Sequence, residues 1–199
     1  PIDPVAMRDQ LDKTAKNTLL ITLDSDAPLS ARVLYVGADN RYAGRQAGDL
    51  IKAALPKGGK IMAFVGKRTE NAQERLAGLR EAISGSKVEL IDLMLDEGDP
   101  VKTGDNVAEA LNKYPDIAGM VGLWGYNGPF ILRSLRRLDK VGQVKIVCFD
   151  DEPETLRGIE EGAIFGSVAQ QPFEYGYQAV HLMNMLLKGD KSVIPQDKR

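Results

Sequence analysis

Short apolar runs alternate with helix-patterned segments along most of this 199-residue chain. Each run is bounded by Gly, Pro, Asp or Asn, which is typical of strands that are buried on both faces of a parallel sheet. The predicted strands are residues 19–23, 32–36, 60–65, 88–95, 118–123, 145–149 and 164–169. This alternation predicts an α/β fold in which βαβ units build parallel sheets.

The segments between the predicted strands have apolar residues at helical spacing. In the last of these segments, Gly176, Val180 and Leu187 lie on one stripe. Gly189 then follows as a helix stop signal. The alternation breaks once, at residues 24–31, because D-S-D-A-P-L-S-A is too short for a helical crossover. Such a link indicates an edge strand or a passage between lobes.

The composition excludes several classes of function. The 26 Lys and Arg residues nearly balance the 28 Asp and Glu residues, so the chain has no electrostatic footprint for nucleic acid. No apolar stretch approaches the roughly 18 residues that a membrane helix needs. Cys148 is the single cysteine and His181 the single histidine, which excludes an internal disulfide and the usual zinc ligand sets. We expect Cys148 to be a buried thiol, and we expect neither a metal nor a cofactor.

The motifs of the common α/β enzymes are missing from the sequence. No strand is followed by the phosphate-binding pattern G-x-x-x-x-G-K-[ST] or by the dinucleotide-binding pattern G-x-G-x-x-G. The G-x-S-x-G pattern around the nucleophile of α/β-hydrolases is also missing. A kinase or a reductase therefore stays only a distant alternative, and a binding function without catalysis is favoured.

Several polar or aromatic residues are predicted to lie at the carboxyl edge of the sheets. The carboxyl ends of parallel strands open onto the ligand crevice of an α/β fold. Carboxylates accept hydrogen bonds, amides accept and donate them, and guanidinium groups donate them. With an aromatic face, this mixture suits a neutral molecule rich in hydroxyl groups. The candidates are Asp24, Asp150 and Gln170 at strand ends, Arg75 near a helix start, and Trp124 and Asn127 after the predicted strand 118–123.

Five of these candidates also have a purely structural interpretation. The two aspartates are compatible with turn caps, because Asp is common after strands. Arg75 is also compatible with a surface ion pair to Glu70 or Glu74, Trp124 with core packing, and Gln170 with an ordinary loop.

A series of short motifs adds a family resemblance over essentially the whole chain. The chain resembles the type I periplasmic sugar-binding proteins of the ribose-binding kind, which are kin to the effector domains of LacI-type repressors. No single motif is decisive, whereas their order and spacing together are specific. The motifs are I-T-L-D at 21–24, G-A-D-N at 37–40, A-G-x-x-A-G at 43–48, Q-E-R-x-x-G at 73–78, Y-P-D-I at 114–117, V-C-F-D at 147–150 and S-V-A-Q-Q-P at 167–172.

The resemblance implies two doubly wound parallel-sheet lobes joined by a hinge. Residues 1–37 and 171–199 would form part of the N-terminal lobe, incomplete in this chain, and residues 38–170 the C-terminal lobe. The hinge would include Ala38, Asp39 and Gln171.

On the family pattern, Asp24, Arg75, Asp150 and Gln170 match sugar-contacting positions. Two departures from the ribose-binding pattern put ribose itself in doubt. Ser25 stands where Arg is usual, and Trp124 stands where Asn is usual, which makes Asn127 the candidate for the amide.

The function that the resemblance implies is solute binding without catalysis. The protein would be a monomer in the periplasm or another extracytoplasmic space. It would bind a pentose or hexose by hinge closure and deliver it to the permease of an ABC transporter. The alternative is the effector-sensing domain of a LacI-type regulator, which would need a helix-turn-helix upstream.

Overall fold

The computed structural model describes residues 3–195, and these residues form two compact units. The larger unit consists of residues 40–68 and 72–170. The smaller unit contains the described chain up to Asp39, residues 69–71, and the described chain from Gln171 onward. Within residues 3–195, no helix is both long enough and apolar enough to cross a membrane.

The larger unit is built on a five-stranded parallel sheet. Its strand order, β4-β3-β5-β6-β7, is that of a doubly wound sheet whose order reverses between β3 and β5. The predicted strands of this unit are confirmed, with β7 shorter than expected. The strands are β3 (Gly59–Val65), β4 (Val88–Leu95), β5 (Ile117–Gly122), β6 (Lys145–Phe149) and β7 (Gly166–Val168).

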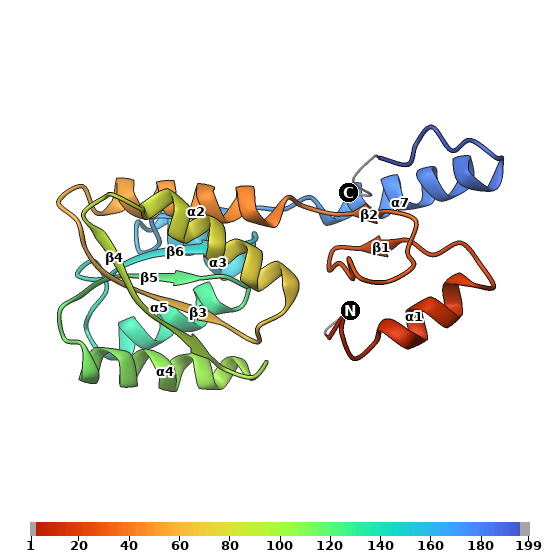
Figure 1. Ribbon diagram of the computed structural model, residues 1–199. Helices are drawn as coiled ribbons and strands as arrows, with labels where there is room; N and C mark the ends of the chain where they lie inside the picture. The colour runs from red at the N-terminus through yellow and green to blue at the C-terminus, as the bar shows by residue number, and fades with distance from the viewer. Residues whose placement is uncertain (1–2, 196–199) are drawn as a thin grey trace. The chain divides into compact units, whose positions relative to one another are not determined.

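Helices cover both faces of this sheet (Figure 1). The side chains of β3 alternate between the two faces, as the pleat of a strand requires. Ala63 therefore packs in the core under one helical layer, and Phe64 packs in the core under the other. This double burial explains why the strands are continuous apolar runs in the sequence. The first layer contains α2 (Asn40–Ala54) and α3 (Glu70–Ile83), and the second contains α4 (Pro100–Lys113), α5 (Asn127–Arg137) and α6 (Pro153–Glu160).

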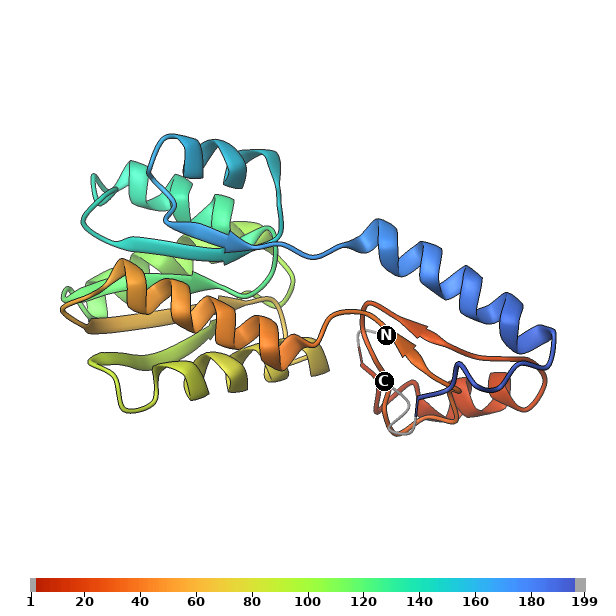
Figure 2. The ribbon, with the colours of Figure 1, turned by 90° about the horizontal axis from the view of Figure 1, so that it is seen from above.

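The smaller unit contains a pair of short parallel strands, β1 (Thr22–Leu23) and β2 (Tyr35–Val36). The remaining elements are α1 (Arg8–Ala15) and α7 (Pro172–Leu187), and α7 runs beside the two strands (Figure 2). Both strands are shorter than predicted.

The segment between β1 and β2 is held by polar contacts instead of a helical crossover. Asp26 and Arg32 form a buried ion pair there. The Thr22 hydroxyl donates to Asp26 Oδ1 over 2.6 Å. These contacts organise the chain that follows β1, where Asp24 lies.

The predicted α/β architecture is therefore confirmed, with a doubly wound parallel sheet in the larger unit.

Candidate ligand-binding site

Five of the six predicted site residues lie at or near the carboxyl ends of strands in the larger unit. Asp24, the sixth, follows β1 in the smaller unit. The five are Arg75, Trp124, Asn127, Asp150 and Gln170.

Arg75 is buried at the sheet edge and does not lie on the solvent face of α3. The whole residue is only 2% exposed. Nε donates to Asn40 Oδ1 over 2.9 Å, and Nη1 donates to the carbonyl of Leu123, which follows β5, over 2.7 Å. The guanidinium carbon lies 4.4 Å from the centre of the Phe149 ring, at the end of β6. Arg75 thus brings a cation to the ends of two neighbouring strands.

Two glycines bring α2 and α3 close enough to place Arg75 there. A Cβ on Gly44 of α2 would lie 2.1 Å from the carbonyl oxygen of Arg75. A Cβ on Gly78 of α3 would lie 1.9 Å from the carbonyl oxygen of Arg41. Only glycine fits at such distances, so the glycines of two sequence motifs, A-G-x-x-A-G and Q-E-R-x-x-G, serve one helix–helix contact.

Asp150 ends β6 in the left-handed backbone conformation, with φ of 66°. Its Oδ1 accepts a hydrogen bond of 2.6 Å from Gln170 Nε2. A Cβ on Gly125 would lie 3.0 Å from Asp150 Oδ2, so the carboxylate lies against the backbone next to Trp124. Asp150, Gln170 and the segment containing Trp124 are therefore neighbours.

Trp124 lies where the strand order reverses between β3 and β5, which is where doubly wound sheets bind ligands. A Cβ on Gly66, just after β3, would lie 2.0 Å from Trp124 Cζ3, so the indole packs directly on that backbone. The ring meets Tyr126 edge to face, with centroids 6.0 Å apart. The indole Nε1 is buried and has no hydrogen-bond partner within residues 3–195. An unused donor of this kind is uncommon in a folded interior.

Asn127, predicted as a direct sugar contact, lies inside the protein next to Trp124, and its role in binding stays a prediction. Asn127 is fully buried. Its Nδ2 donates to Asp96 Oδ2 over 3.0 Å, and its Oδ1 accepts from the amide of Trp124 over 3.0 Å. Both ends of the side-chain amide are used inside the protein, so Asn127 supports the backbone of Trp124.

Asp96 is the residue of this region that the sequence reasoning missed. It directly follows β4 and is 1% exposed. The same signal that indicated Asp24 and Asp150, an aspartate directly after an apolar strand, also applies to Asp96. In the described part of the chain, no group of three or more His, Cys, Asp or Glu residues is placed to hold a metal ion.

The three predicted hinge residues lie where the chain passes between the units. Apart from residues 69–71, the chain leaves the smaller unit after Asp39 and returns to it at Gln171. The carbonyls of Asp24 and Ala38 both lie within hydrogen-bond distance of the Tyr35 hydroxyl, at 2.8 and 3.3 Å. These positions fit a hinge, and that role stays a prediction.

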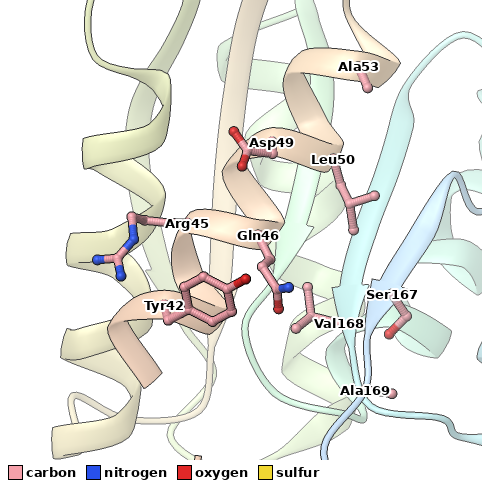
Figure 3. Close-up of a pocket in the computed structure, with 9 residues that line it drawn as sticks. All are labelled: Tyr42, Arg45, Gln46, Asp49, Leu50, Ala53, Ser167, Val168 and Ala169. Atoms are coloured by element: carbon pink, nitrogen blue, oxygen red, sulfur yellow. The ribbon is translucent and has the colours of Figure 1, made fainter. Parts of the chain in front are cut away.

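A groove of about 700 Å³ lies elsewhere on the larger unit, between α2 and the edge strand β7 (Figure 3). Tyr42, Gln46 and Asp49 of α2 line it together with Ser167 of β7. None of the six predicted site residues lines this groove. It is therefore separate from the cluster at the strand ends.

Comparison with known proteins gives consistent matches. The family model for the periplasmic binding protein domain matches residues 1–191. The ribose import binding protein RbsB of Escherichia coli (strain K12) is 28% identical over 178 residues, which are 88% of this chain and 59% of that protein. The protein of the same name from Haemophilus influenzae is 30% identical over 186 residues, which are 92% of this chain and 63% of that protein. The chain thus spans about three fifths of the length of these relatives.

Among solved structures, GanP, a glucose-galactose binding protein from Geobacillus stearothermophilus, superimposes with a TM-score of 0.92 at 26% identity. That match covers 100% of this chain and 72% of GanP.

Proposed function

Because the chain belongs to the family of periplasmic binding protein domains, we propose that it binds a monosaccharide, a pentose or a hexose, and catalyses no reaction. The names of its relatives support this range: two are ribose import binding proteins and one is a glucose-galactose binding protein. Import is the stated role of the first two, which favours delivery to an ABC permease in a periplasmic or extracytoplasmic space over the regulator alternative.

The observation behind this proposal is the cluster of complementary groups at the strand ends. Asp150 offers a carboxylate acceptor, Gln170 an amide that donates and accepts, and Arg75 a buried guanidinium. The Trp124 indole adds an aromatic face at the strand reversal. Sugar hydroxyls both donate and accept hydrogen bonds, while the C–H faces of sugars pack on aromatic rings. The cluster therefore matches both the hydroxyl groups and the C–H faces of a sugar.

Asp24 and Asn127 as further contacts, and Ala38, Asp39 and Gln171 as hinge residues, stay predictions within this proposal. A hinge-closing binder would favour its closed state by the difference in ligand affinity between its open and closed states.

Isothermal titration of the protein encoded by the complete gene tests the proposal. Ribose, arabinose, xylose, allose, glucose and galactose are titrated separately, with a sugar alcohol as the control for nonspecific heat. We expect saturable binding of at least one monosaccharide and unchanged sugar in the recovered solution. Absence of binding to all of them would refute the proposal. A helix-turn-helix encoded upstream of Pro1, rather than an export signal, would favour the regulator.

A further inference from the structure

The buried carboxylate of Asp96 is the centre of a hydrogen-bond network beside the proposed site. Its Oδ1 accepts from the Tyr126 hydroxyl over 2.6 Å and from the Gly98 amide over 2.9 Å. Its Oδ2 accepts from the Thr103 hydroxyl over 2.7 Å and from Asn127 Nδ2 over 3.0 Å. These donors are all neutral, and together they use the acceptor capacity of a carboxylate. Because every acceptor position of the carboxylate is occupied, the network fixes the positions of the donor groups.

Two of these donors also hold Trp124. Asn127 Oδ1 accepts from the amide of Trp124, and the amide of Asn127 donates to the carbonyl of Trp124, each over 3.0 Å. This reciprocal pair closes the W-G-Y-N turn in the manner of a capping box. The Tyr126 ring meets the indole edge to face, with an interplanar angle of 77°. Asp96 thus holds the backbone of Trp124 through Asn127, and the indole ring through Tyr126.

The backbone after β3 packs against both aromatic rings of this network. A Cβ on Gly66 would lie 2.0 Å from the indole of Trp124 and 2.6 Å from the Tyr126 hydroxyl. The two rings are therefore packed on the backbone after β3, while Asp96 holds them from the end of β4, the strand next to β3. The turn after β4 thus restrains an aromatic ring at the reversal between β3 and β5.

We propose that Asp96 is a positioning residue for the sugar site, acting on ligand affinity only through the orientation of Trp124. The effect on affinity rests on the proposed sugar-binding function. The effect on the orientation of the indole does not rest on that function, because the hydrogen-bond network of Asp96 is present without a ligand.

The first experiment measures the indole directly, since Trp124 is the single tryptophan of the chain. Asp96→Asn replaces one acceptor oxygen with an N–H₂ group that faces donors, so part of the network must break. In the sugar-free 199-residue chain, we expect fluorescence emission to shift to longer wavelength and acrylamide quenching to increase. The matched control is Asp99→Asn in the same turn, because Asp99 is exposed and its carboxylate caps α4 by accepting from the Val101 amide. The control should keep the parent emission and quenching.

The second experiment asks whether Asp96 acts through Trp124. Sugar affinity is measured for Asp96→Asn, Trp124→Ala and the double variant in the protein encoded by the complete gene. We expect each single change to weaken binding roughly tenfold or more. The affinity of the double variant should equal that of the single variant with the lower affinity. Losses that multiply in the double variant would show that Asp96 acts independently, which overturns the proposal.

A third variant keeps the proposal testable if Asp96→Asn does not fold. Tyr126→Phe removes one donor to Asp96 and keeps the ring, so we expect a smaller shift of the emission in the same direction. Unchanged emission and quenching in Asp96→Asn, or in Tyr126→Phe where the first variant is unfolded, overturns the proposal. If no monosaccharide binds while the emission shifts as expected, Asp96 still positions Trp124 and only the proposed function fails.

Discussion

Asp24 and Asp150 have the same backbone conformation and the same hydrogen bonds to the following strand. Their φ angles are 62° and 66°. The Asp24 amide donates to the Val36 carbonyl over 2.9 Å, and the Asp150 amide donates to the Val168 carbonyl over 3.0 Å. In both cases the residue before that valine donates its hydroxyl to the aspartate carbonyl: Tyr35 over 2.8 Å and Ser167 over 2.5 Å. Each unit therefore ends a strand with the same aspartate turn.

The left-handed turn at Asp150 predicts an unusual order of stability among variants. Gly adopts a positive φ without strain, whereas Ala has a penalty of roughly 1 kcal/mol or more. Both changes remove the carboxylate bonded to Gln170. We therefore expect Asp150→Gly to have the higher free energy of unfolding, by about 1 kcal/mol, in urea titrations.

Asp92 is the matched control for that order. It is an exposed residue of β4 and is not among the positive-φ residues of the described chain. Asp92 directly follows a register shift of β4 but has no positive φ. Gly is the less stable choice in a strand at negative φ, so Asp92→Ala should be more stable than Asp92→Gly. The same order at both positions would contradict the role assigned to the Asp150 turn.

The carboxylate of Asp150 is expected to contribute to sugar affinity beyond its structural role. Asp150→Asn keeps the size and tolerates the left-handed conformation, and its side-chain oxygen still accepts from Gln170. It loses the negative charge that strengthens hydrogen bonds from sugar hydroxyls. We expect the dissociation constant to rise about tenfold by isothermal titration, with thermal stability nearly unchanged. Wild-type affinity in this variant would remove Asp150 from the site.

Arg75 predicts a difference between two changes that both keep a positive charge. Arg75→Lys loses the planar group that stacks on Phe149 and bonds both Asn40 and the Leu123 carbonyl. We expect at least about tenfold weaker sugar binding and a lower melting temperature, since a buried polar group loses partners. Arg80→Lys is the control, because Arg80 is an exposed residue of the same helix. Equal affinities of the two variants would refute the assignment of Arg75.

The sheet of the larger unit could be predicted because its strands are buried on both faces and so form continuous apolar runs. The strands of the smaller unit were predicted too long. There the buried Asp26–Arg32 pair and its hydrogen bonds organise the chain, and such contacts leave no periodic pattern in the sequence.

The roles of side chains within the site were harder to predict than its place. The sequence left open whether Arg75 is a surface residue, and its burial depends on the helix contact that Gly44 and Gly78 permit. The hydrogen bond from Asn127 to Asp96 could not be predicted, because Asp96 lies 31 positions earlier and meets Asn127 only in the folded sheet. Strand ends follow from apolar runs in the sequence, whereas hydrogen bonds between residues distant in sequence leave no local pattern.

Replacing glycine by alanine should have opposite effects on stability at Gly78, in the contact between α2 and α3, and at Gly176, in α7. Gly78→Ala would place a methyl group 1.9 Å from the Arg41 carbonyl oxygen, so the helices must separate. We expect a loss of roughly 2 kcal/mol or more in the free energy of unfolding. Gly176→Ala in α7 meets no atom within 4 Å, and its better helix propensity should raise stability by about 0.5–1 kcal/mol. Thermal melts of both variants check the signs, and destabilisation by Gly176→Ala would contradict the open space there.

The buried thiol of Cys148 is expected to be inert in the native chain. Burial raises its pKa from 9.0 to about 11, because the thiolate is poorly solvated in the core. At pH 9 an exposed thiol is half ionised, so iodoacetamide should label the chain rapidly in guanidinium chloride and very slowly without it. Rapid labelling of the native chain would contradict the burial.

The same shift gives a pH dependence with a definite sign. Well below pH 9 the thiol is protonated in both states, and its contribution to stability is constant. Between the unfolded pKa of 9.0 and the folded pKa of about 11, the unfolded chain releases the proton while the native chain keeps it. The free energy of unfolding should therefore fall with rising pH, by about 2–3 kcal/mol in total. Cys148→Ala removes this contribution, so urea titrations across pH 8–11 should show a shallower decline for the variant. Identical slopes in the two proteins would show that the Cys148 thiol ionises equally in both states.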